Sequence, residues 1–83
     1  MNAERPTPPE PINGLVVAIR GSVVDVRFEY DLPHINTVLR AGRNEEIVIE
    51  VLAQLDEHHI RGIALTPTQG LARGTTVQNT GGL

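Results

Sequence analysis

The sequence predicts an all-β domain, folded as a small barrel or sandwich of about six short strands. Short apolar runs recur at spacings of roughly 8 to 12 residues, with turn-forming residues between them. Valine and isoleucine are frequent in these runs, and their branched side chains fit a pleated strand. Phe28 and Tyr30 are the only aromatic residues, so the core must be built from aliphatic side chains.

The chain opens with a proline-rich segment, residues 1–11, which holds four of the six prolines. Proline lacks the N–H group that a sheet interior requires, so we expect this segment to be a flexible tail. The domain proper is then expected to span residues 12–83.

Two strands are predicted next, at residues 15–19 and 23–28. The dipeptide Gly21-Ser22 between them is a turn signal, so the two runs indicate a β-hairpin. Within the second run, apolar and polar side chains alternate, as they do in a strand with one buried face.

The middle of the chain leaves two choices open. Residues 35–39 fit either a short strand or a loop. Residues 45–55 fit a strand with period two and equally a helix with Asn44 as its N-cap. The cluster of β-branched residues favours the strand.

The last strands are predicted at residues 60–65 and 75–77. The polar segment 56–59 forms the turn before them, and Pro67, Gly70 and Gly74 interrupt the chain between them.

Charge and composition limit the function. The 83 residues carry a net charge of −3, which argues against binding to nucleic acid. There is no cysteine, and so no disulfide or thiolate metal site. There is also no lysine, which excludes a P-loop and Schiff-base chemistry within this chain. No apolar run approaches the roughly 20 residues of a membrane-spanning helix.

No catalytic, cofactor-binding or metal-binding residues are expected. Residues 70–74 contain glycines but lack the lysine of a phosphate-binding loop, so they are interpreted as a turn. Residues 56–59 (Asp-Glu-His-His) lack zinc-site spacing and are interpreted as a solvated turn. Arg73 is expected to pair with a carboxylate such as Asp25 across one end of the barrel.

Some strands are apolar on both faces. If Leu15 and Ile19 point inward, Val16 points outward, and if Ile49 points inward, Val48 and Leu52 point outward. An exposed apolar patch on a small domain often marks a partner surface. We therefore expect Val16, Val48 and Leu52 to contact a neighbouring subunit.

The ordered motifs of the chain resemble those of one known family. The family pattern Gly-x-Val-Val-Asp-Val-x-Phe matches residues 21–28, and Val-Arg-x-Ile-Ala followed by Thr-x-Gly-Leu-x-Arg-Gly matches residues 60–64 and 68–74. The resemblance is to the N-terminal domain of the beta (catalytic) subunit of F-type ATP synthases, and it covers residues 14–81. The residues that carry this signature are Gly21, Val24, Asp25, Val26, Arg61, Gly70, Leu71, Arg73 and Gly74. Gly62 departs from the pattern, which often has threonine there.

The resemblance implies a closed six-stranded antiparallel β-barrel. It also implies alpha subunits as partners in an alternating ring, on the cytoplasmic side and peripheral to the membrane. ATP or ADP and Mg²⁺ would belong to a nucleotide-binding domain that follows the barrel in the family. That domain is absent from this sequence, which is expected to end at the junction to it.

A second hypothesis is a free-standing β-barrel adaptor or oligonucleotide-binding module, a role that small barrels often serve. The acidic charge and the scarcity of aromatic residues weigh against oligonucleotides. Self-association of the isolated domain is also compatible with the sequence.

Overall fold

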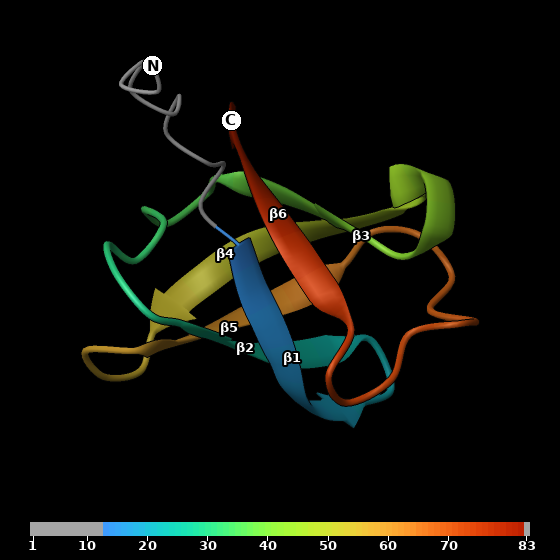
Figure 1. Cartoon of the computed structure of the whole chain (residues 1–83), viewed down its shortest axis with the longest axis horizontal. Helices are drawn as coiled ribbons and strands as arrows, with labels where there is room; N and C mark the ends of the chain where they lie inside the picture. Colours follow the sequence, from blue (N-terminus) through green and yellow to red (C-terminus); the bar gives the residue numbers. More distant parts are fainter. Residues whose placement is uncertain (1–12, 83) are drawn as a thin grey trace, which may run out of the picture.

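The computed structural model describes residues 13–82, and the predicted tail at residues 1–11 lies outside the described residues. The described residues form a closed barrel of antiparallel strands (Figure 1). In chain order the elements are β1 (Asn13–Arg20), β2 (Val23–Phe28), β3 (Val38–Ala41), the 3₁₀ turn η1 (Arg43–Glu45), β4 (Ile47–Gln54), β5 (His59–Ala64) and β6 (Thr76–Gly82).

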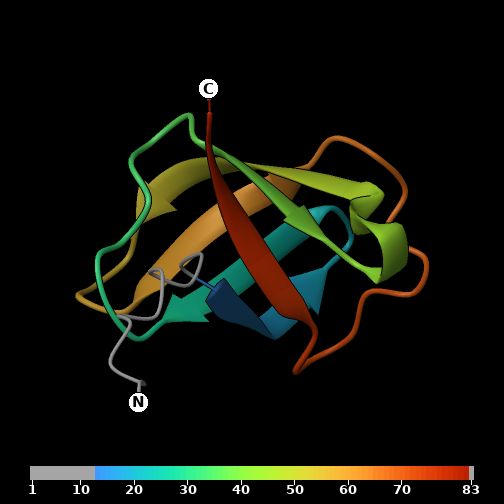
Figure 2. The same ribbon diagram turned by 45° about the horizontal axis from the view of Figure 1, so that its top comes forward.

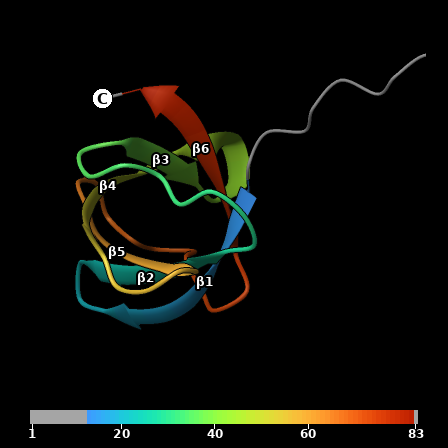
Figure 3. The same ribbon diagram turned by 90° about the vertical axis from the view of Figure 1, so that its left-hand side faces the viewer.

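The strands are hydrogen-bonded around the barrel in the order β1-β2-β5-β4-β3-β6. Figure 3 views the molecule from the side and shows the strands arranged as a ring. The ring is closed by β6, which pairs with β1 on one side and with β3 on the other (Figure 2). The all-β prediction and the closed six-stranded antiparallel barrel are confirmed, and the sandwich alternative is wrong.

The barrel interior is aliphatic except for one ring. Alternate side chains of each strand point inward, as the period of a strand requires. Phe28 is fully buried and is the one aromatic residue of the core. The other buried apolar residues are Val16, Val24, Val26, Leu39, Ala41, Ile47, Ile49, Val51, Ile60, Ala64 and Val77.

Residues 45–55 form a strand and not a helix. Asn44 is not an N-cap, because it lies inside η1 with a φ of 62°. The chain enters β4 three residues after Asn44, and Ile47, Ile49 and Val51 then point into the core. Residues 35–39, for which both a strand and a loop were predicted, are partly loop and partly strand. Ile35 lies in an exposed loop, and β3 begins at Val38.

Two strands contain a register irregularity. The pairing of β1 with β2 shifts between Val16 and Ala18, and the pairing of β4 with β5 shifts between Val51 and Ala53. Such a bulge inserts one residue, so the alternation of inward and outward side chains changes phase across it.

The bulge in β1 overturns the predicted orientation of Val16. Val16 is only 1% exposed and belongs to the core, whereas Leu15 is 51% exposed. Ile19, on the far side of the bulge, does pack against the core as predicted. Counting with period two across residues 15–19 therefore gave the correct face for Ile19 and the wrong face for Val16.

Candidate subunit interface

The outer face of the barrel carries an ion pair between β2 and β5. Asp25 lies between the inward-facing Val24 and Val26, so its side chain points outward, directly opposite Arg61 in the register of the two strands. Arg61 donates from Nε to Oδ1 of Asp25 at 2.9 Å and from Nη2 to Oδ2 at 3.0 Å. This two-point geometry fixes the guanidinium plane against the sheet.

The pair stabilises the charged form of Asp25. The hydrogen bond from Arg61 lowers the pKa of Asp25 below its usual value, burial opposes this shift, and the charges of Arg61, Arg20 and His59 add to the lowering. The same hydrogen bond raises the pKa of Arg61. Only 15% of the Asp25 side chain is exposed, so the carboxylate is largely shielded from water.

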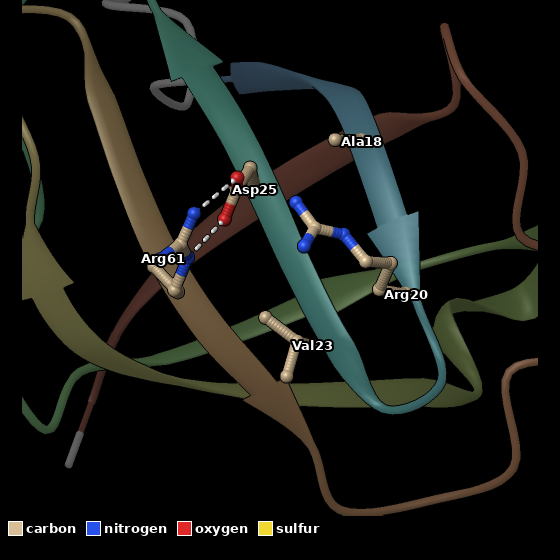
Figure 4. A pocket seen from close by; sticks show the side chains of 5 residues that line it. All are labelled: Ala18, Arg20, Val23, Asp25 and Arg61. Atoms are coloured by element: carbon tan, nitrogen blue, oxygen red, sulfur yellow. Dashed lines mark hydrogen bonds and ion pairs between the residues drawn. The ribbon is translucent and has the colours of Figure 1, made fainter.

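A shallow hollow of about 260 Å³ opens beside the ion pair. Its lining residues are Ala18, Arg20, Val23, Asp25 and Arg61. Figure 4 shows that they come from β1, β2 and β5 and that the Arg20 guanidinium extends over β2 toward Asp25. The hollow therefore combines an apolar base with two cationic groups and one anionic group.

Exposed and half-buried apolar side chains lie beside this hollow on the outer faces of β2, β5 and β4, with Glu50 of β4 among them, opposite Ile63. We name these apolar side chains the outer strip. Its members are Val23, Val48, Leu52, Ile63 and Leu65. Val23 pairs with Ile63 across β2 and β5, and the Leu65 N–H donates to the Val48 carbonyl at 2.8 Å. Leu65 is 58% exposed and Leu52 is 47% exposed, so the strip is open to a partner.

The three residues expected at a subunit contact do not share a face. Val16 points into the core, so its predicted outward position is wrong for the reason given above. Val48 is half-buried and Leu52 is exposed, both on the outer face of β4. A contact with another subunit through Val48 and Leu52 remains a prediction.

The family signature residues serve different structural positions. Gly21, Gly70 and Gly74 lie in turns with φ values of 58°, 87° and 89°, a conformation that favours glycine. Val24 and Val26 are buried in the core, and Leu71 packs against it.

Arg73 does not pair with Asp25. It is exposed in the loop between β5 and β6, while both carboxylate oxygens of Asp25 accept hydrogen bonds from Arg61. Sequence analysis named Arg61 only as a signature residue and expected Asp25 to pair with Arg73, so it missed the pair that Asp25 and Arg61 form. A usable signal was present, because each is a charged residue within a strand whose neighbours are apolar.

The glycine-containing loop at residues 70–74 is a turn, and three of its amide groups donate hydrogen bonds within the protein. The N–H of Leu71 donates to the Thr68 carbonyl, that of Gly74 to the Val16 carbonyl, and that of Ala72 to Oγ1 of Thr75. A phosphate cradle needs such N–H groups to point at the ligand. The loop geometry thus agrees with the turn interpretation.

The polar segment between β4 and β5 is organised by Asp56. Its Oδ1 accepts hydrogen bonds from the N–H groups of His58 and His59 and lies 2.8 Å from Nδ1 of His59. The hydrogen bond from the His58 backbone lowers the pKa of Asp56, with a further contribution from the His59 side chain. Within residues 13–82, no group of three or more histidine, cysteine, aspartate or glutamate side chains is placed to hold a metal ion.

Across residues 13–82 there is no helix with the length and apolarity to span a membrane.

Comparison with known proteins places the sequence in one family. The model for the beta-barrel domain of the ATP synthase alpha/beta family matches residues 16–81, which is most of the chain. The chain belongs to the ATP synthase alpha/beta family.

Curated relatives within the ATP synthase alpha/beta family are similar over most of this chain. ATP synthase subunit beta 2 of Albidiferax ferrireducens is 67% identical over 73 residues, covering 87% of this chain and 14% of that protein. ATP synthase subunit beta 2 of Polaromonas naphthalenivorans is 65% identical over 69 residues, covering 83% and 14%. ATP synthase subunit beta 1 of Chlorobaculum tepidum is 57% identical over 68 residues, covering 82% and 14%. The chain thus spans about one seventh of the length of these relatives.

Proposed function

We propose that this chain is the barrel domain of an ATP synthase beta subunit and that it acts in subunit assembly. In this role the barrel packs beside the barrels of alpha subunits in an alternating ring. The barrels keep their end of the ring rigid while other domains of the subunits change shape. The family match and the names of the relatives support membership of such a subunit.

The observation that carries the proposal is the outer strip on a closed barrel. Within residues 13–82, closure pairs each strand with two neighbours and leaves little free strand edge for another chain to extend. Association must then use outward-facing side chains. The outer strip supplies apolar side chains on adjacent strands, which is the composition typical of the centre of a protein interface.

An alternating ring gives each barrel two neighbours, and so it requires a second contact face. β1 lies three positions from β4 in the strand order, so its first residues lie across the barrel from the β4 end of the outer strip, whereas Ala18 and Arg20 at its other end line the hollow. Leu15 is exposed on the outer face of β1. We propose this residue as part of the second contact.

The chemistry of the whole enzyme lies outside this chain in the proposed function. ATP or ADP and Mg²⁺ would bind to a nucleotide-binding domain of the parent subunit. The complete complex would couple ion transport across a membrane to ATP synthesis or hydrolysis, with the head peripheral to the membrane on its cytoplasmic side. The absence of lysine supports this division, because a P-loop requires that residue.

The test is to mix this chain with the barrel domain of the matching alpha subunit and to measure mass by light scattering. We expect a defined mixed complex, with each component also measured alone to detect self-association. Leu52→Glu should weaken the complex, because it places a charge in the outer strip. Leu55→Glu is the matched control, since Leu55 is 44% exposed but lies in the turn after β4.

Thermal unfolding of both variants shows whether the barrel remains folded. Two separate species at high protein concentration would contradict the proposed function. Equal binding by the wild-type chain and the folded Leu52→Glu variant would remove the outer strip from the contact.

A further inference from the structure

Arg20 ends β1 at the edge of the hollow, where its positive charge helps to lower the pKa of Asp25 without a direct contact to it. Among residues 13–82, the guanidinium group of Arg20 makes no hydrogen bond or ion pair. A guanidinium group offers five N–H donors in a planar fork that matches a carboxylate. Figure 4 shows that this fork extends over β2 toward Asp25.

The charge of the hollow is unbalanced. Asp25 is the one acidic residue of the lining, and both of its oxygens accept hydrogen bonds from Arg61. The two arginines therefore leave one positive charge in excess, on a chain whose net charge is −3. This local excess attracts an anionic group to the hollow.

The size of the hollow selects the kind of anion. Its volume of about 260 Å³ is below the roughly 300–1,000 Å³ typical of pockets for small molecules and cofactors. Ala18 and Val23 form an apolar base, which suits the methylene groups of one amino-acid side chain. A single glutamate or aspartate side chain combines this apolar stem with a carboxylate.

The position of the hollow connects it to the proposed assembly surface. Val23 lines the hollow and is also a member of the outer strip. A subunit that covers the strip would therefore remove water from Arg20. A desolvated guanidinium group without an anion is strongly unfavourable, so the partner must supply a compensating charge.

We propose that the hollow receives one aspartate or glutamate side chain of the neighbouring subunit, with Arg20 as the residue that binds its carboxylate. This inference rests on the proposed function, because the partner is the subunit that covers the outer strip.

The absence of lysine makes a direct test available. Arg20→Lys introduces the single lysine side chain of the chain. A carbodiimide then joins that amine to any carboxylate in direct contact, with loss of one water. After mixing with the matching alpha subunit, we expect a cross-linked product that mass spectrometry maps to position 20 and to one aspartate or glutamate of the partner.

Two controls accompany this experiment. Arg43→Lys places the same amine at the start of η1, in a separate hollow lined by Gly42, Ile47 and Gln69 among others, and should give no such product. The wild-type chain reports any reaction of the N-terminal amine.

Affinity provides a second measurement. We expect Arg20→Ala to weaken the complex at least about tenfold and to reduce its dependence on salt, because one charged contact is lost. Arg43→Ala should change neither quantity.

The outcomes separate this inference from the proposed function. The inference would be overturned, and the assembly role left intact, by two results together. The first is a complex that forms but gives no cross-link from position 20 to the partner, or only a cross-link within the chain. The second is an affinity that Arg20→Ala leaves unchanged. Failure of the wild-type chain to form any complex would overturn both the inference and the proposed function.

Discussion

Phe28 and Gly14 form a coupled pair inside the barrel, and the pair predicts a specific pattern of stability. The two residues are direct partners across β1 and β2. A Cβ atom added to Gly14 would lie 2.8 Å from Cε2 and Cζ of Phe28 and 2.6 Å from Cγ1 of Val26. These separations are too short for carbon atoms, so the ring or the strand must move. We expect Gly14→Ala to lower the free energy of unfolding by about 1–3 kcal/mol, the usual range for overpacking a core.

Phe28→Leu should destabilise the barrel for the opposite reason. It removes part of a fully buried ring, and we expect a loss of about 1–2 kcal/mol, below the roughly 3–5 kcal/mol of a complete truncation to alanine. In the double variant the new methyl group occupies space that the ring has vacated. The combined loss should therefore be about 1–2 kcal/mol smaller than the sum of the single losses.

Urea and thermal unfolding followed by circular dichroism measure these differences. A change of 1 kcal/mol corresponds to a shift in Tm of roughly 4–8 °C for a domain of this size. Gly21→Ala is the matched glycine control, because Gly21 has a φ of 58° and an added Cβ would meet no atom within 4 Å. Its effect comes from backbone strain and should add to that of Phe28→Leu. Additive losses for Gly14→Ala with Phe28→Leu would refute the steric argument.

Three further predictions concern charged residues. The pKa of Asp25 is lowered in the folded state, so its contribution to stability is present above its usual value near about 4 and disappears as the pH falls through the lowered value. In urea unfolding, the free energy of unfolding of Asp25→Asn should therefore fall less than that of the wild-type chain between about pH 5 and about pH 2. Parallel curves of unfolding free energy against pH for the two chains would contradict this. Arg73→Ala should change the free energy of unfolding by no more than about 0.5 kcal/mol, because Arg73 is exposed and Arg61 is the partner of Asp25, and a larger loss would revive the predicted pairing. Zn²⁺ should leave the Tm of the wild-type chain unchanged, and a rise in Tm with Zn²⁺ would indicate a metal site. Asp56→Ala should lower the Tm, because it removes the hydrogen bonds that Asp56 accepts in the β4–β5 turn.

The strands were predictable where the local pattern was uninterrupted. Residues 23–28 form β2 with the predicted bounds, because an alternating run lies between a glycine turn and a polar segment. Residues 45–55 satisfied both the helical and the strand period. Their β-branched composition favoured the strand, and closure of the sheet between β5 and β3 accounts for it.

The sequence could not predict features that depend on register. A bulge adds one residue to a strand without a distinct composition, and so the inward position of Val16 was not visible in its neighbours. Asp25 and Arg61 are 36 residues apart and meet only because β5 pairs with β2. That order is not the order of the chain, so the signature identified both residues without indicating that they form a pair.

Closure of the barrel links the candidate interface to its specificity. Because each strand within residues 13–82 is paired on both sides, selectivity for a partner must come from outward-facing side chains and not from strand addition. Apolar contacts through the outer strip provide affinity but accept many apolar surfaces. The guanidinium of Arg20, which makes no hydrogen bond or ion pair within residues 13–82, adds a requirement, because a subunit that covers Val23 must also present an anion or leave a cation desolvated. In the proposed ring, this requirement would distinguish an alpha subunit with a suitably placed carboxylate from a second copy of the same barrel, and so would favour alternation over self-association.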